Sequence, residues 1–192
     1  MRKYLIYAAS LFAFIYSTGC SNSERPAHNT GVQGTQPDTS RQALLQVVRA
    51  AEAKLKTTQT IDAFNGNITI TAYNNYANHF PNDTLSAAFL FNAGGIASSM
   101  GQYTQALGFY NNVCTKFPNS RLIPECLLVE GFIYDNNLND TAKAHAKYSE
   151  LINRFPNDSI STQARQAIKL LGKTPEEIGK EFEEKNKKTK KA

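Results

Sequence analysis

YNNVCTKFPN, at residues 110–119, is one of three copies of a sequence that decides the fold. The other copies are YNNYANHFPN at residues 73–82 and YSELINRFPN at residues 148–157. Their phenylalanines are separated by 37 and 38 residues (117 − 80 and 155 − 117), and they are Phe80, Phe117 and Phe155. This spacing accommodates two helices and two turns, and repetition at a fixed period is typical of stacked repeats. The sequence therefore predicts a series of helical hairpins.

Each copy predicts the end of one helix and the start of the next. Apolar residues at its first, fourth and eighth positions form one helix face. The proline that follows disfavours the helical conformation of the residue before it, so we expect helices to end at Phe80, Phe117 and Phe155. The Asn, Asp, Ser and Thr residues that come next suit a helix N-cap. A new helix should start within about four residues.

Two of the copies also carry small and aromatic residues at the positions of a known repeat motif. The second copy carries Leu90, Gly94, Ala97, Ala106, Tyr110 and Val113, ahead of Pro118. The third carries Leu127, Gly131, Tyr134, Ala144, Tyr148, Leu151 and Pro156, with a one-residue insertion near Asp140. This pattern resembles the tetratricopeptide repeat family. The resemblance implies an all-α fold, a right-handed α-solenoid of about three hairpins with a C-terminal capping helix. The small residues should lie where the two helices of a hairpin cross.

The first copy departs from this pattern. Residues 67–71 (NITIT) alternate in polarity and are rich in β-branched side chains, which locally favours a strand. We expect a helix there because the sequence after it repeats so well. The first helix should span Ser40 to Lys56, and the connector at residues 57–66 is long for a hairpin turn.

The N-terminal residues predict export. Two cations at residues 2–3 precede the mostly apolar residues 4–16, which are too few to span a hydrocarbon core of about 30 Å. Gly19 before Cys20 resembles a bacterial lipobox, which implies a signal peptide at residues 1–19 and a lipid on Cys20. An ordinary signal peptide cut near Gly19 is the alternative. Residues 20–38 are rich in small polar residues and predict a flexible tether.

The remaining boundaries follow from capping residues and charge. Helical repeats are expected at residues 39–172, a helix capped by Thr174 and Pro175 at residues 173–185, and a basic tail at residues 186–192. Without Arg2 and Lys3 the net charge is 19 − 16 = +3, and the five lysines from Lys185 onward supply +5, so residues 20–184 sum to 3 − 5 = −2. The tail could contact anionic surfaces or be an ordinary solvated terminus. The sequence has no stripe of basic residues interleaved with aromatic residues, which is the pattern that would predict nucleic-acid binding.

No residue set predicts catalysis, a cofactor or a metal site. The histidines are scattered at His28, His79 and His145, without the convergent spacing that zinc needs. The chain has no phosphate-binding glycine loop and no Gly-x-Ser-x-Gly sequence with a histidine partner. We therefore expect a protein that is not an enzyme.

Two further patterns suggest covalent modification. Cys114 and Cys126 lie six residues either side of Ser120, so a hairpin turn centred there places them opposite each other. They could form a disulfide or remain two buried thiols. Three Asp-hydroxyl-apolar sequences resemble an O-glycosylation acceptor motif of some Gram-negative envelopes, which implies modification at Thr84, Thr141 and Ser159. The same residue types also suit a helix N-terminus.

Tetratricopeptide solenoids bind peptides or helices on a concave face lined by the first helix of each hairpin. The resemblance places groove positions at Phe91, Ser98, Ser99, Leu128, Phe132, Asp135 and Asn136. The two phenylalanines could instead be buried in helix packing.

The long period and the Phe-Pro-Asn-Asp ending resemble tetratricopeptide lipoproteins of the bacterial envelope, such as the outer-membrane assembly and cell-division coordinator types. The resemblance implies a lipid-anchored adaptor, on the outer membrane and facing the periplasm, that scaffolds other envelope proteins. One alternative is a fixed structural subunit of an outer-membrane assembly or secretion machine. Another is a carrier of a small ligand or glycan.

Overall fold

A computed structural model describes residues 38–56 and 62–173 of the chain, together with residues 176, 177, 179, 180 and 183. These residues form helices and no strand. The elements are α1 (Arg41–Lys56), α2 (Ala63–His79), α3 (Thr84–Ser99), α4 (Tyr103–Lys116), α5 (Ile123–Phe132), the π-helical segment η1 (Ile133–Asn137), α6 (Thr141–Arg154) and α7 (Ser159–Leu170). The fold is all-α, as the sequence predicts.

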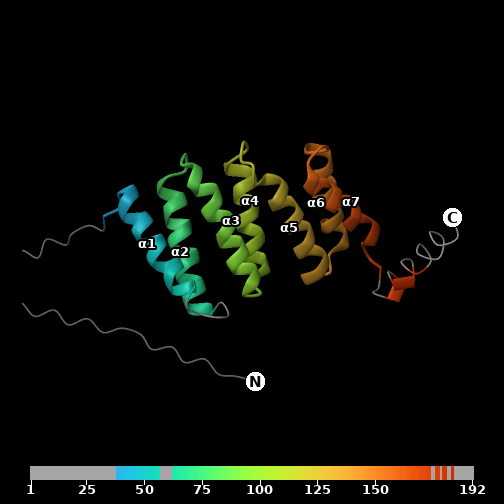
Figure 1. The fold of residues 1–192 in the computed structure, drawn as a ribbon, viewed down its shortest axis with the longest axis horizontal. Helices are drawn as coiled ribbons and strands as arrows, with labels where there is room; N and C mark the ends of the chain where they lie inside the picture. Colours follow the sequence, from blue (N-terminus) through green and yellow to red (C-terminus); the bar gives the residue numbers. More distant parts are fainter. Residues whose placement is uncertain (1–37, 57–61, 174–175, 178, 181–182, 184–192) are drawn as a thin grey trace, which may run out of the picture. The chain divides into compact units, whose positions relative to one another are not determined.

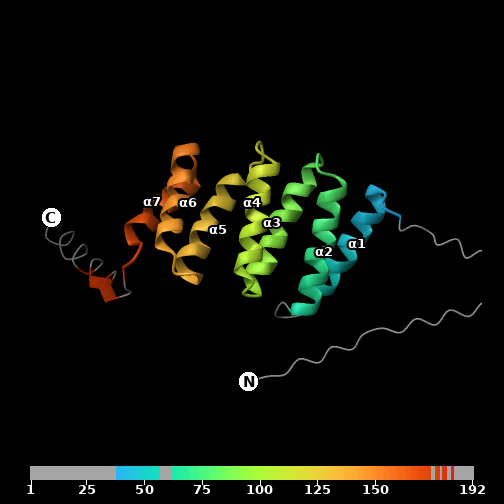
Figure 2. The same cartoon turned by 180° about the vertical axis from the view of Figure 1, so that it is seen from behind.

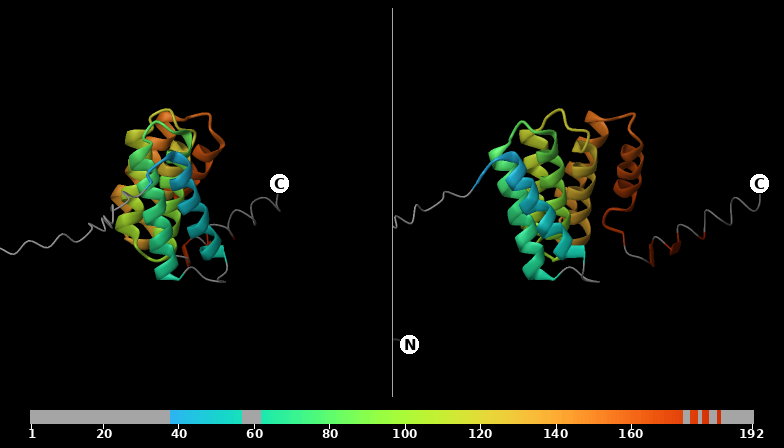
Figure 3. Two further views of the ribbon diagram at one scale, coloured as in Figure 1. Left: turned by 90° about the vertical axis from the view of Figure 1, so that its left-hand side faces the viewer. Right: turned by 60° about the vertical axis from the view of Figure 1, so that its left-hand side comes forward.

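The helices pack in chain order as antiparallel hairpins, α1 with α2, α3 with α4, and α5 with α6 (Figure 1). The same order is seen from behind in Figure 2, and Figure 3 shows the hairpins stacked behind one another. Helix α7 packs against α5 and α6, on the side away from α4. The described part of the chain is thus an α-solenoid of helical hairpins.

The C-terminal helix expected at residues 173–185 lies largely outside the described residues. Residues 176, 177, 179, 180 and 183 are helical. The capping residues Thr174 and Pro175 and the basic tail are not among the described residues, and neither are the predicted signal peptide, Cys20 and nearly all of the predicted tether.

Each repeated phenylalanine ends a helix, which confirms that prediction. Phe80, Phe117 and Phe155 have ψ values of 62°, 65° and 57°, outside the helical range. The N–H of each still donates to the carbonyl four residues earlier, at Tyr76, Val113 and Leu151. The proline that follows has no N–H to continue the ladder, so the chain leaves the helix at this point.

After two of these stops the next helix starts as expected. Asp83 and Asp158 are the N-caps of α3 and α7, and their carboxylates accept from Leu85 N and Ile160 N at 2.9 Å. The buried hydroxyls of Ser86 and Ser161 donate to the carbonyls of Phe80 and Phe155 at 2.6 and 2.5 Å. The carbonyl groups that follow the last helical turns therefore have hydrogen-bond partners.

The middle turn is longer, so the expected start within four residues of Phe117 is wrong. Ser120 Oγ accepts from Leu122 N at 3.2 Å, and α5 begins only at Ile123. Pro124 lies in the first turn of α5, where a proline is tolerated, and an earlier helix start would move it into the helix interior.

Residues 67–71 are helical, as expected, despite their strand-like pattern. Thr69 and Thr71 donate their hydroxyls to the carbonyls of Asn65 and Asn67, at 2.9 and 2.8 Å. The connector expected at residues 57–66 is shorter, because Asp62 accepts from Asn65 N at 2.9 Å and starts α2 at Ala63. Tertiary burial of one helix face, which includes Ile70 and Tyr73, overrides the local strand preference.

Within the second and third hairpins, a glycine of the first helix lies against a tyrosine ring of the second. A Cβ atom added at Gly94 would lie 2.7 Å from Tyr110 Cε1, and one added at Gly131 would overlap the ring of Tyr148. Ala106 and Ala144 are fully buried on the second helices. The small residues therefore lie where the helices cross, as predicted.

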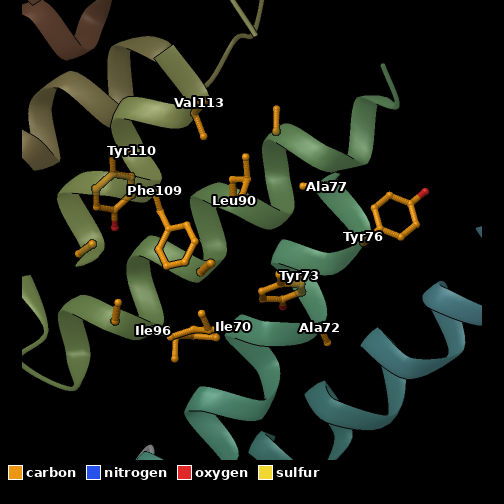
Figure 4. Packing of buried hydrophobic residues seen from close by; sticks show 14 of the residues in the cluster. Ile70, Ala72, Tyr73, Tyr76, Ala77, Leu90, Ile96, Phe109, Tyr110 and Val113 are labelled. Carbon is orange, nitrogen blue, oxygen red and sulfur yellow. The ribbon is translucent and has the colours of Figure 1, made fainter. Parts of the chain in front are cut away.

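The core consists of two groups of buried side chains. The first cluster extends from Val48 and Ala51 of α1 across α2, α3 and α4 to Cys126 and Ile133, and much of it is drawn in Figure 4. The second cluster lies within α5, α6 and α7 and consists of Ile123, Leu127, Ala144, Tyr148, Leu151 and Ala164. The clusters adjoin in α5, whose Cys126 belongs to the first cluster and whose Ile123 and Leu127 belong to the second, and we call the neighbouring α4/α5 contact the seam.

Replacement of Gly131 by alanine tests the close crossing. We expect Gly131→Ala to lower the free energy of unfolding by about 1–3 kcal/mol, because its Cβ must displace the buried Tyr148 ring. Gly108→Ala is the matched control, since Gly108 is an exposed helical glycine and a methyl group added there would meet no atom within 4 Å. It should stabilise by about 0.5–1 kcal/mol. Urea unfolding measures the free energy of unfolding of both variants, and an equal change in the two would contradict the prediction.

Asp83 joins the first three helices. Its Oδ2 accepts from Arg41 Nε of α1 at 2.6 Å and from Tyr76 Oη of α2 at 2.7 Å, while Oδ1 caps α3. The hydrogen bond from Arg41, followed by those from Leu85 N and Tyr76, lowers the pKa of Asp83 to about 2. Ionised Asp83 thus stabilises the fold above its unfolded pKa of about 3.9, and this stabilisation is lost as the pH falls towards 2.

The variant Asp83→Asn should therefore be less stable than the wild type at pH 7, by about 1 kcal/mol after discounting for the solvent-exposed Arg41. This difference should shrink as the pH falls from 4 towards 2. Asp158→Asn is the control: Asp158 makes a capping bond of the same length but has no arginine partner within the described residues. Urea midpoints against pH measure both variants. An equal loss of stability in the two variants, or a loss in Asp83→Asn that is independent of pH, would contradict this role of the ionised Asp83.

Candidate functional site

The third hairpin presents an exposed aromatic side chain on its first helix. Phe132, the last residue of α5, is 55% exposed although its neighbours Gly131 and Ile133 are buried. An aromatic side chain contributes most of its free energy when it is removed from water. Phe132 is therefore available for an intermolecular contact.

Phe132 lines an open pocket of about 620 Å³ between the end of α5, η1, α6 and the end of α7. Asp135 and Asn136 of η1 also line it, so the structure brings together three of the predicted groove residues. Its other walls include Tyr148, Leu170 and Lys173. The pocket combines apolar surface with a carboxylate, an amide and an ammonium group, a composition that suits a peptide or a helix from another protein.

The other predicted groove residues lie elsewhere. Leu128 is half-buried and packs against the second cluster. Phe91 is half-buried, and its ring centroid lies 5.5 Å from that of Tyr110. The alternative that Phe91 is buried in helix packing therefore holds for most of its ring. Ser98 and Ser99 are at the end of α3, and Ser99 donates its hydroxyl to the carbonyl of Gly95 at 2.9 Å. None of these four residues lines the pocket of Phe132.

The π-helical segment is a feature that the sequence reasoning missed. Leu138 N donates to Ile133 O at 3.0 Å, a bond that spans one residue more than an α-helical bond, and Asn139 has a positive φ of 52°. The one-residue insertion seen near Asp140 is accommodated here. The wider turn carries Asp135 and Asn136, and Asn136 Nδ2 donates to Phe132 O at 3.2 Å. Such turns often occur at functional sites.

A buried ion pair was also missed. Glu130 of α5 is 2% exposed, and its Oε2 lies 2.9 Å from Lys147 Nζ of α6. Burial raises the pKa of Glu130, and the attraction of Lys147 opposes this only in part. No sequence signal separates Glu130 from the exposed glutamates, because its burial depends on the packing of α6.

The residues predicted as O-glycosylation sites lie at the starts of helices. Thr84, Thr141 and Ser159 are each the first residue of a helix, after the N-caps Asp83, Asp140 and Asp158, and all three are exposed. Capping accounts for the recurrence of the pattern, and glycosylation remains a prediction. Cys114 and Cys126 are free thiols, half-buried and buried respectively.

Within the described ranges, no group of three or more His, Cys, Asp or Glu side chains could hold a metal ion. None of the helices there is long and apolar enough to cross a membrane.

Comparison with protein families agrees with the geometry of the second and third hairpins. Residues 88–120 and 125–158 match the tetratricopeptide repeat model. Both segments are thus similar to tetratricopeptide repeats. The first spans most of α3 and all of α4, and the second spans most of α5 through α6. No curated protein matches the chain. Tetratricopeptide repeats typically serve as non-catalytic scaffolds for protein–protein interaction, which is the broad role that the match supports.

Proposed function

We propose that this protein is a membrane-tethered, non-catalytic adaptor that binds other envelope proteins through its tetratricopeptide surface. The observation that carries the proposal is the exposed Phe132 beside Asp135 and Asn136, on the first-helix side of a tetratricopeptide hairpin. Burial of such a ring by a partner is worth about 1.5–3 kcal/mol. The carboxylate and amide beside it can orient the partner through hydrogen bonds, as polar groups around a hot spot do.

The pocket suits a partner segment better than a small molecule. It is an open hollow lined by residues of α5, η1, α6 and α7, and Phe132 in this lining is 55% exposed. Small-molecule sites usually enclose most of their ligand. A helix or an extended peptide, in contrast, can place one apolar side chain on Phe132 and extend beyond the pocket.

The lipid anchor is the second part of the proposal. Signal cleavage before Cys20 would leave a lipid-bearing residue followed by residues 21–38, 18 residues rich in small polar side chains. A flexible segment of that length has an average end-to-end distance of about 25 Å. Fully extended it reaches about 60 Å. The repeats could then contact proteins within the membrane or next to it, which fits an outer-membrane lipoprotein that faces the periplasm.

Pull-down of the tagged full-length protein from detergent-solubilised membranes tests the adaptor role. Phe132→Ala should reduce recovery of bound proteins at least tenfold and leave the urea midpoint nearly unchanged, because the ring is largely exposed. Phe64→Ala is the matched control, since Phe64 of α2 is 74% exposed and lies in another hairpin. Equal recovery with wild type and Phe132→Ala would exclude this pocket as the binding site. A single partner in fixed stoichiometry would favour the structural-subunit alternative.

Metabolic labelling with a fatty-acid analogue tests the anchor. We expect the wild type and Cys114→Ala to be labelled, and Cys20→Ala to lose the label, because only the Cys20 thiol is placed to be acylated after cleavage. Equal labelling of Cys20→Ala and the wild type would end the lipoprotein proposal. Absence of label in all three proteins, with a shortened mature chain, would indicate an ordinary signal peptide.

A further inference from the structure

Two cysteines meet at the seam between the repeats. Cys114 is near the end of α4, and Cys126 is in the first half of α5. Cys126 is fully buried in the first cluster, whereas Cys114 is half-buried and packs against both clusters. The pair therefore lies at the contact of α4 with α5, close to where the two clusters adjoin.

The surroundings of the two thiols make them chemically unequal. A hydrogen bond with Cys126 lowers the pKa of Cys114, and the positive charges of Lys147 and Arg154 add to this effect, while burial and Glu130 oppose it. The same hydrogen bond and burial raise the pKa of Cys126. Cys114 is thus the thiol that ionises first, and it is also the more accessible of the two.

We propose that Cys114 and Cys126 are a redox-active dithiol that closes to a disulfide between the second and third hairpins. Two observations point to it: both cysteines lie at the α4/α5 contact, where Cys114 packs against the cluster that contains Cys126, and Cys114 is the more exposed of the two. An isolated buried cysteine, in contrast, is usually an inert packing residue. Closure requires the two side chains to approach to a sulfur–sulfur distance of about 2.05 Å.

The oxidant in the proposed step is an organic disulfide, RSSR. The Cys114 thiolate attacks one sulfur of RSSR, a mixed disulfide forms at Cys114, and RS⁻ leaves. Cys126 then gives up its proton, attacks Cys114 Sγ and expels the second RS⁻. Both leaving groups take up protons, so that two thiols and RSSR become one intramolecular disulfide and two RSH. Cys114 is the attacking residue and Cys126 the resolving residue.

The bond would hold α4 against α5 and fix how the second repeat meets the third. It closes a loop of 13 residues (126 − 114 + 1) that contains the whole middle turn. For a loop of this size, the chain-entropy model predicts that the unfolding equilibrium constant falls by roughly a hundredfold. The inference is independent of which protein binds to the pocket of Phe132.

The test oxidises the purified full-length protein with glutathione disulfide, blocks the remaining thiols by alkylation and digests the protein with trypsin. Cleavage after Lys116 and Arg121 separates the two cysteines, so a bridge appears as one linked peptide pair that reductant splits. We expect this pair to form, and we expect the urea midpoint to be higher in the oxidised wild type than in the same protein after reduction. Recovery of Cys114 and Cys126 as alkylated or singly glutathionylated peptides would overturn the proposal.

Single variants test the assigned roles. Cys126→Ser should stop at a mixed disulfide between Cys114 and glutathione, because the resolving thiol is missing. Cys114→Ser should react at least tenfold more slowly, because Cys126 is fully buried. Equal reaction rates of the two variants would contradict the attacking role of Cys114. Circular dichroism verifies that both variants are folded, and the comparison of oxidised with reduced wild type needs no variant.

Discussion

The close crossing of two helices within a hairpin is the constraint on which the rest of the structure depends. At Gly94 and Gly131 the absence of a side chain lets a tyrosine ring of the partner helix lie directly on the backbone. Tyr110 and Tyr148 are almost completely buried as a result. Any larger residue at the glycine would push the helix axes apart and open the core on both sides.

Much of the fold could be predicted because its determinants are local. The Phe-Pro sequences end a helix through the backbone of two adjacent residues, and the aspartate N-caps bind backbone N–H groups two or three residues away. Both can therefore be recognised in the sequence alone. The glycine and alanine positions were recognisable because they recur with the period. The helical state of residues 67–71 needed the repeat as context, since their β-branched side chains alone favour a strand.

The features that escaped prediction depend on contacts between distant residues or on irregular backbone. The ion pair of Glu130 and Lys147 forms only when α5 and α6 pack together, and no spacing rule reports it. The insertion near Asp140 was visible, but its accommodation in a π-helical turn was not. Pro124 delays the start of α5 and so makes the middle turn unlike the other two. Of the seven groove residues, only Phe132, Asp135 and Asn136 share the pocket, because the irregular turn is what gathers them.

The repeated and the variable parts of the chain have separate roles. The repeated residues end the second helices and fill the hairpin crossings, whereas Phe132 on the first helix of the third hairpin stays exposed, where we propose a binding role. The most direct test places a photoreactive phenylalanine analogue at position 132 in intact cells, and at the exposed His145 of α6 for comparison. We expect a discrete crosslinked adduct from position 132 that is absent or much weaker from position 145. Adducts from position 145 alone, or none from position 132, would contradict a binding role for the pocket of Phe132.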